Sequence, residues 1–227
     1  MNTKNVVPTT PFVLIMIILG SLFSCESHDP NPLPEDGDYY PLHEGESKYY
    51  LRVQLSPDTH ETLRTDTLRI VFAGDTTIAE KDFNRFDFYY HWETPDKKII
   101  EQHDLFKIIR KSGHRYYTLP FTSDTTQFVF LETDKPAGTT WTYYSGFEND
   151  FKSTFTIEAV NTFKKVNGKI YGDVIVMRWE SLYKYMDGPY EHSYTEKKYF
   201  AKNVGVIYSE AEFYNYPVLT RFTLMNR

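Results

Sequence analysis

Apolar and polar residues alternate along most of the chain beyond residue 38, with the two-residue period of a β-strand. The alternation is plainest in Tyr50–Leu55 and Thr67–Phe72. Other segments rich in Tyr, Phe, Val, Ile and Thr fit a pleated surface in the same way. They are predicted as strands over Arg85–Trp92, Leu105–Lys111, His114–Phe121, Gln127–Leu131, Ser153–Val160, Lys169–Trp179, Glu196–Ala201, Val204–Phe213 and Leu219–Leu224. The pattern therefore predicts about eleven short strands.

Turn residues separate these segments. Asn167-Gly168 predicts a tight hairpin, and Ala73-Gly74-Asp75, Thr94-Pro95-Asp96 and Asp187-Gly188-Pro189 predict further turns. No window combines helical periodicity with caps over three turns, and Glu101–Arg110 comes nearest. We therefore predict a mainly β fold: a single antiparallel β domain over residues 39–227, built as a curved sheet, a half-barrel or a sandwich.

The N-terminal pattern is different. An apolar run of 12 residues, Phe12–Phe23, ends at Ser24-Cys25. A helix needs about 20 apolar residues to cross a bilayer, so the run is predicted as part of a cleaved signal peptide, residues 1–24. Cys25 is the only cysteine, and its setting resembles the bacterial lipobox, which implies lipidation of Cys25 as the mature N-terminus. The alternative, an ordinary secretory signal, requires a small-x-small cleavage site that Leu22-Phe23-Ser24 does not provide.

Residues 25–38 are predicted as an acidic, Pro-rich tether, because their prolines favour extended conformations and their acidic residues repel one another. The whole chain carries 31 acidic and 25 basic residues, for a net charge of −6. This balance, without a long basic block, argues against nucleic acid as a partner. With Cys25 carrying lipid, no intrachain disulfide can form, so the aromatic-rich core must supply the stability.

Four segments occur in a recognisable order: Tyr39-Tyr40-Pro41-Leu42-x-x-Gly45, Gly138-x-x-Trp141, Gly168-x-x-Tyr171-x-Asp173-Val174-Ile175 and Tyr199-Phe200-Ala201-Lys202-Asn203-Val204-Gly205-Val206-Ile207. This set resembles a family of Bacteroidota-type envelope lipoproteins of uncharacterised function. The resemblance implies a mainly antiparallel β domain and an envelope location, and it implies no reaction. Lys48 departs from the family pattern, which usually has an aromatic residue there; its aliphatic stem can still cover apolar surface.

No motif for catalysis or metal binding stands out. The seven histidines show no metal-ligand spacing, and neither a Gly-x-Ser-x-Gly elbow nor a phosphate loop occurs. No metal and no cofactor is therefore predicted. His91 and Glu93 share one strand face, and loop carboxylates are frequent, so an envelope hydrolase with a loop-borne carboxylate/histidine site remains the alternative function.

Dense aromatic clusters are the remaining lead. Adjacent rings in a strand point to opposite faces, so one ring of each pair can build the core while the other lies on the second face. The alternative is an exposed platform of rings that binds a ligand, for which Tyr90, Trp92, Trp141 and Tyr143 are the predicted residues.

The sequence thus predicts a lipid-anchored, non-enzymatic binding or assembly module of the bacterial envelope, at the outer membrane. Its expected partners are the membrane, through Cys25, and a glycan, a lipid-like ligand or an envelope protein.

Overall fold

The structure is a computed structural model that describes residues 37–41, 45–93, 97–103, 107–119, 126–146, 149–186, 188–214 and 218–226. The predicted signal peptide, Cys25 and the tether up to residue 36 lie outside these residues, as does the predicted turn at 94–96. Within the described residues, no helix is long and apolar enough to cross a membrane.

Nearly all of the described chain is β-strand. The strands are β1 (Ser47–Leu55), β2 (Thr62–Ile78), β3 (Lys81–Glu93), β4 (Ile99–His103), β5 (Lys107–Ser112), β6 (Arg115–Thr118), β7 (Phe128–Glu132), β8 (Thr140–Ser145), β9 (Phe151–Val166), β10 (Lys169–Tyr183), β11 (Glu191–Ala201), β12 (Gly205–Phe213) and β13 (Val218–Leu224). They include two strands absent from the predicted set, β4 and β8. The segment Glu101–Arg110, which comes nearest to helical spacing, begins in β4 and ends in β5.

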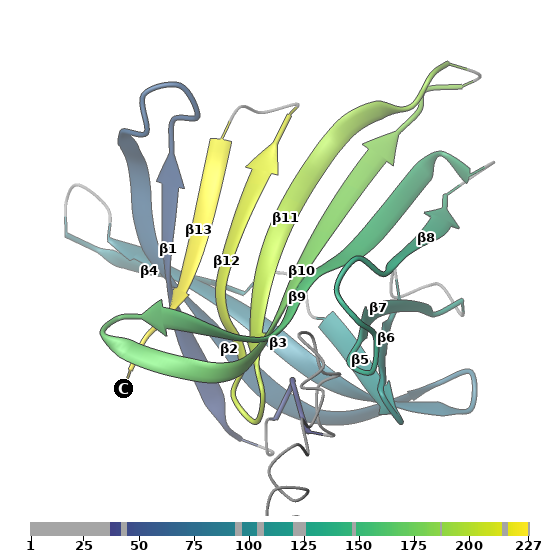
Figure 1. The fold of residues 1–227 in the computed structure, drawn as a ribbon. Helices are drawn as coiled ribbons and strands as arrows, with labels where there is room; N and C mark the ends of the chain where they lie inside the picture. Colours follow the sequence, from purple (N-terminus) through teal and green to yellow (C-terminus); the bar gives the residue numbers. More distant parts are fainter. Residues whose placement is uncertain are drawn as a thin grey trace, which may run out of the picture. The chain divides into compact units, whose positions relative to one another are not determined.

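All thirteen strands belong to one antiparallel sheet, in the order β7-β6-β5-β3-β2-β1-β13-β12-β11-β10-β9-β8, with β4 beside β3 (Figure 1). The sheet curls until its two edge strands, β7 and β8, contact each other through side chains. The Trp141 indole N–H in β8 donates to the Val129 carbonyl in β7 at 2.8 Å, and the rings of Tyr143 and Phe128 stack at 4.7 Å. The predicted antiparallel β domain is confirmed, and of the three architectures the structure is the curved sheet, nearly closed like a barrel, rather than a sandwich.

The predicted turns had different outcomes. Asn167 and Gly168 have φ of 48° and 83°, and they form the hairpin between β9 and β10 as predicted. The turn predicted at 73–75 is wrong, because β2 continues through it and the pairing with β3 shifts between Phe72 and Asp75. Gly74, with φ of 100°, lies in this irregularity. A glycine inside a strand marks a bulge as readily as a turn, so the two cannot be told apart from the residue type.

Residues 37–40, at the start of the described chain, cover one of the two openings of the curled sheet. Tyr39 is fully buried, and its backbone N–H donates to the Tyr116 hydroxyl at 2.8 Å. The same hydroxyl donates to the Asp38 carboxylate at 2.8 Å, and the Asn203 N–H donates to the Asp38 carbonyl at 2.6 Å. The Gly37 carbonyl accepts from Lys111 Nζ at 3.1 Å. The last two residues of the predicted tether are therefore hydrogen-bonded to the β domain.

Two further features close this end. The Tyr40 ring packs among four core rings at centroid distances between 5.6 and 6.1 Å, those of Phe86, Tyr116, Phe130 and Phe200. The tip of the β9–β10 hairpin returns to the end of β13, where the Asn167 side-chain amide donates to the Leu224 carbonyl at 2.8 Å. We call this the closed end. The opposite end, with the β1–β2 and β12–β13 hairpins, is the open end (Figure 1).

Replacing Tyr116 with phenylalanine is expected to lower the free energy of unfolding by about 1–3 kcal/mol. The change leaves the Asp38 carboxylate and the Tyr39 N–H without their shared partner in a buried site. Urea unfolding measures the effect, with Tyr144→Phe as the control, because Tyr144 is 47% exposed. Equal unfolding midpoints for the two variants would contradict this account of the closed end.

Candidate functional site

A cavity of about 390 Å³ lies on the concave face of the sheet. At the closed end it is bounded by Tyr40, Lys48 and Gly205, and towards the open end by Gln54 and the partly exposed Phe213. The walls between are mostly apolar. The apolar residues that line them are Tyr50, Leu68, Ile70, Phe86, Phe88, Tyr90, Ile109, Trp179, Val206, Ala211 and Phe222. The arrangement matches a ligand pocket, which is typically concave and apolar with a few polar groups.

Strand alternation directs these side chains into the cavity. Along β1 every second residue from Lys48 to Gln54 lines it, and along β3 the same holds for Phe86, Phe88 and Tyr90. Because successive side chains of a strand point to opposite faces, the residues between them lie on the convex face. The curvature of the sheet then brings inward residues of distant strands towards one another across the interior.

A buried carboxylate stands in the cavity wall on β11. Glu196 is 5% exposed and accepts hydrogen bonds from the Tyr194 hydroxyl and from Lys198 Nζ. Burial, together with the negative charge of Glu196, raises the pKa of Tyr194 well above its usual value, so its hydroxyl stays a donor. Lys198 therefore has its counter-ion within the wall, and the carboxylate has two donors.

Lys107, on β5, faces this group. Five strands separate β5 from β11 in the sheet order, yet Lys107 interacts electrostatically with both Lys198 and Glu196. Its Nζ lies 4.6 Å from the centre of the Phe130 ring. Burial and the charge of Lys198 lower the pKa of Lys107 to about 7, against a smaller opposite effect of Glu196. No hydrogen bond or ion pair joins Lys107 Nζ to the residues that the structure describes.

Lys48 closes the floor of the cavity. Its Nζ donates to the Pro41 carbonyl at 3.0 Å and to the Val204 carbonyl. Burial lowers the pKa of Lys48 to about 8, while Glu46 and Asp38 act in the opposite direction. Lys48 thus ties the N-terminal segment to the β11–β12 turn. Gly205, in that turn, has a φ of 95°, and a Cβ there would lie 3.0 Å from Lys48 Nζ.

Arg52 is the fourth basic residue of the wall, and it is already neutralised. Its guanidinium donates through Nε to the buried Asp66 carboxylate at 2.6 Å, and Nη2 makes a second bond to the other oxygen. Arg64 also contacts Asp66, at 2.8 Å. The Arg52 guanidinium lies 4.1 Å from the centre of the Tyr90 ring. This pair orders the wall towards the open end.

The four predicted ligand-binding rings do not gather in one place. Tyr90 lines the cavity beneath Arg52. Trp92 lies outside the cavity lining, with the Arg64 guanidinium 4.6 Å from its ring. Trp141 and Tyr143 pack against core rings where the two ends of the sheet meet. Their predicted role in ligand binding remains a prediction, and only Tyr90 has a cavity beside it.

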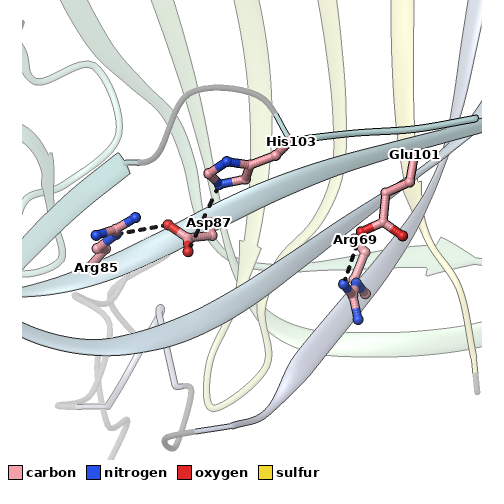
Figure 2. A network of polar contacts seen from close by, with 5 residues as sticks. All are labelled: Arg69, Arg85, Asp87, Glu101 and His103. Atoms are coloured by element: carbon pink, nitrogen blue, oxygen red, sulfur yellow. Dashed lines mark hydrogen bonds and ion pairs between the residues drawn. The ribbon is translucent and has the colours of Figure 1, made fainter.

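Carboxylate–imidazole contacts occur on the convex face instead. His91 Nδ1 lies 3.5 Å from Glu101, and His103 Nε2 lies 3.9 Å from Asp87. Figure 2 shows His103 and Asp87 with Arg85, which contacts Asp87 at 2.8 Å, and beside them Arg69, which contacts Glu101 at 3.4 Å. His103 and Glu101 are each 46–48% exposed through their side chains. Among the described residues, the cavity lining contains one carboxylate and no histidine, and so no carboxylate–histidine pair of the kind that the hydrolase alternative requires.

No group of three or more His, Cys, Asp or Glu residues with the geometry of a metal site occurs in the described part of the chain.

Sequence reasoning did not single out Lys107, Lys198 or Ala211. A signal was available in β11, where Glu196 and Lys198 share strand parity with Phe200, a fully buried residue. Parity places all three on the inner face. The charges instead suggest a solvent-facing position, and only the curvature of the sheet shows that polar and apolar residues share one interior.

The fold and the cavity define the class of protein: a curved antiparallel β-sheet with an internal, mainly apolar cavity. The sequence matches no protein-family model and no curated protein. Among solved structures, the chain is similar to a Bacteroides fragilis protein described as exported and as having a YmcC-like fold, with 11% identity over 83% of this chain and 98% of the other, at a TM-score of 0.41. A Parabacteroides distasonis protein described as a lipoprotein aligns with 9% identity over 84% and 98% of the two chains, at a TM-score of 0.39.

Proposed function

We propose that this chain is a lipid-anchored envelope protein that binds a lipid-like ligand in the cavity of its β domain, without catalysing a reaction on it. The single observation that carries the proposal is the cavity of about 390 Å³ with mainly apolar walls on the concave face. Apolar walls favour a ligand with a hydrocarbon chain, because transfer of its surface out of water stabilises the complex. A lipid-like molecule is one of the three ligand classes that the sequence leaves open.

The cavity favours this ligand over a glycan. Sugar sites present exposed aromatic faces beside many free hydrogen-bonding groups, whereas three charged side chains of this wall, Arg52, Glu196 and Lys198, already have partners within the protein. Arg52 is bonded to Asp66, and Lys198 and Tyr194 are bonded to Glu196. The wall between these polar groups is apolar and therefore suits a hydrocarbon chain.

The sequence around Cys25 supports the anchor. A lipidated cysteine that precedes a Pro-rich segment would attach the domain to a membrane through the residues before Gly37, and Gly37 lies at the closed end. The open end of the cavity would then point away from the point of attachment. An outer-membrane location agrees with the envelope lipoprotein family that the sequence resembles.

A titration with N-phenyl-1-naphthylamine, a neutral fluorophore that brightens in apolar surroundings, tests the binding function. The protein for this test is the chain from residue 25 with Cys25→Ser, which keeps every described residue and removes only the lipid. We expect saturable fluorescence with one site per chain, and displacement of the fluorophore by decanol. Non-saturable fluorescence, or failure of decanol to displace the probe, would contradict the proposed function.

A further inference from the structure

We infer that the ligand is an amphiphile with an anionic head, held by Lys107 Nζ beside Lys198, and with its chain directed towards Phe213 at the open end. This inference rests on the proposed function and names the class of ligand. A carboxylate head and a phosphate head share the chemistry that Lys107 recognises, and the cavity volume suits a single chain.

The charges of the wall support an anion. Of the residues that the structure describes, four with basic side chains line the cavity, and one carboxylate does so, that of Glu196. Three of the four have partners within the protein: Arg52 has Asp66, Lys198 has Glu196, and Lys48 has two backbone carbonyls. Lys107 Nζ has no hydrogen bond or ion pair with the described residues; it contacts the Phe130 ring and feels the charges of Lys198 and Glu196 at longer range. One cationic group in the cavity is therefore left for a ligand.

The surroundings of Lys107 strengthen the argument. Burying an ammonium group without an anion or a hydrogen-bond acceptor is costly, and a ligand carboxylate would supply both. The Tyr40 ring also contacts Phe130, at 5.6 Å, so its hydroxyl belongs to the same part of the cavity. Burial raises the pKa of Tyr40 well above its usual value, and the hydroxyl remains a donor for the same head group. No hydrogen bond of the Tyr40 hydroxyl to another described residue occurs.

The position of Lys107 also sets the direction of the ligand. Lys107 pairs in register with Phe86, whose ring lies 6.1 Å from Tyr40 at the closed end. From there the cavity extends along Ala211 to Phe213, which is 40% exposed at the open end. A head at Lys107 thus lies deep in the cavity, and the apolar chain occupies the wall between it and the open end.

The experiment compares decanoate, decyl phosphate and decanol as competitors of the neutral fluorophore at pH 7, all below their micellar concentrations. In the unsubstituted cavity we expect decanoate and decyl phosphate to bind at least about tenfold more tightly than decanol, because a charge-assisted hydrogen bond is added. Lys107→Met should remove this preference, so that the anionic ligands no longer bind more tightly than decanol. Lys165→Met, at an exposed lysine of β9, is the matched control and should retain it.

The possible outcomes separate this inference from the proposed function. Equal binding of decanol and decanoate, or an unchanged preference in Lys107→Met, would overturn the anionic head while leaving the lipid-like ligand in place. Preference for only one of the two anions would identify the head group. If none of the three displaces the fluorophore, the proposed function itself fails. The comparison of the three ligands needs no substitution, so it tests whether the head is anionic even if Lys107→Met does not fold.

The pH dependence of decanoate binding gives an independent readout. Lys107, with a pKa of about 7 in the free protein, is protonated below pH 7, so affinity should be nearly constant from pH 6 to 7. Above pH 7 the affinity should fall, by up to about tenfold per pH unit, because the complex must take up a proton. Lys48 adds a second decline from about pH 8. The other groups around Lys107, namely Arg52, Lys198, Glu196, Tyr40 and Tyr194, are present in both variants. The decline that begins at pH 7 should be absent from Lys107→Met, and its persistence there would contradict the inference.

Discussion

Replacing Ala211 with tryptophan is expected to weaken fluorophore binding at least about tenfold, which corresponds to about 1.4 kcal/mol. Ala211 is 1% exposed, lies on β12 directly opposite Glu196 and lines the cavity. An indole ring at this position would occupy the space that a hydrocarbon chain needs. The measurement is the same fluorescence titration, made on the chain from residue 25 with Cys25→Ser.

Glu212→Trp is the matched control for this substitution. Glu212 is the next residue of β12, its side chain is exposed, and it points to the opposite face. The control adds the same ring to the same strand, so its fluorophore affinity should stay unchanged. Thermal unfolding of both variants shows whether the inward indole also destabilises the sheet, since overpacking typically costs about 1–3 kcal/mol. A folded Ala211→Trp variant that binds as tightly as Glu212→Trp would place the ligand outside this cavity.

Replacing Cys25 with serine in the complete chain is expected either to release the protein from the membrane fraction or to leave it as an unprocessed precursor. Each buried acyl methylene contributes about 0.8 kcal/mol, and stable anchoring requires more than one chain, so removal of the acceptor thiol removes the whole attachment. The measurement is fractionation of cells after a salt wash, with the protein followed by immunoblotting.

Ser24→Ala is the control for the anchor, because it keeps the cysteine and a small residue before it. This variant should remain in the membrane fraction. Retention of Cys25→Ser with the membrane after the salt wash, in processed form, would contradict the anchor and would require another means of attachment. The binding experiments are independent of this result, since they use the unlipidated chain.

The two-residue alternation of apolar and polar residues was sufficient to predict the mainly β fold, because such alternation over short segments has few structural explanations other than an antiparallel sheet. Asn167-Gly168 also fixed its hairpin, since both residues tolerate positive φ. Strand limits were less accessible. Ile99–His103, an exposed strand rich in polar residues, carries no burial signal, and Gly74 has the appearance of a turn although β2 passes through it.

The candidate site was harder to predict than the fold. Tyr90 lines the cavity. Trp141 and Tyr143 are also aromatic residues two positions apart, like Tyr90 and Trp92, but they connect the two edge strands of the sheet. Residue type alone cannot separate these positions, because an aromatic ring serves a core and a pocket equally well. Lys107 and Glu196 meet only because the sheet curves through five intervening strands. That curvature depends on bulges and long-range pairing, which local sequence patterns do not determine.

Tryptophan quenching by a decanol that carries bromine in mid-chain tests the central claim most directly. Trp179 lines the cavity, whereas Trp92 and Trp141 do not belong to its lining, and these are the three tryptophans of the chain. A chain bound in the cavity brings the bromine close to Trp179, so we expect saturable quenching that is lost in Trp179→Phe and kept in Trp92→Phe. Saturable quenching that survives in Trp179→Phe would show that the ligand binds elsewhere, and would contradict the account.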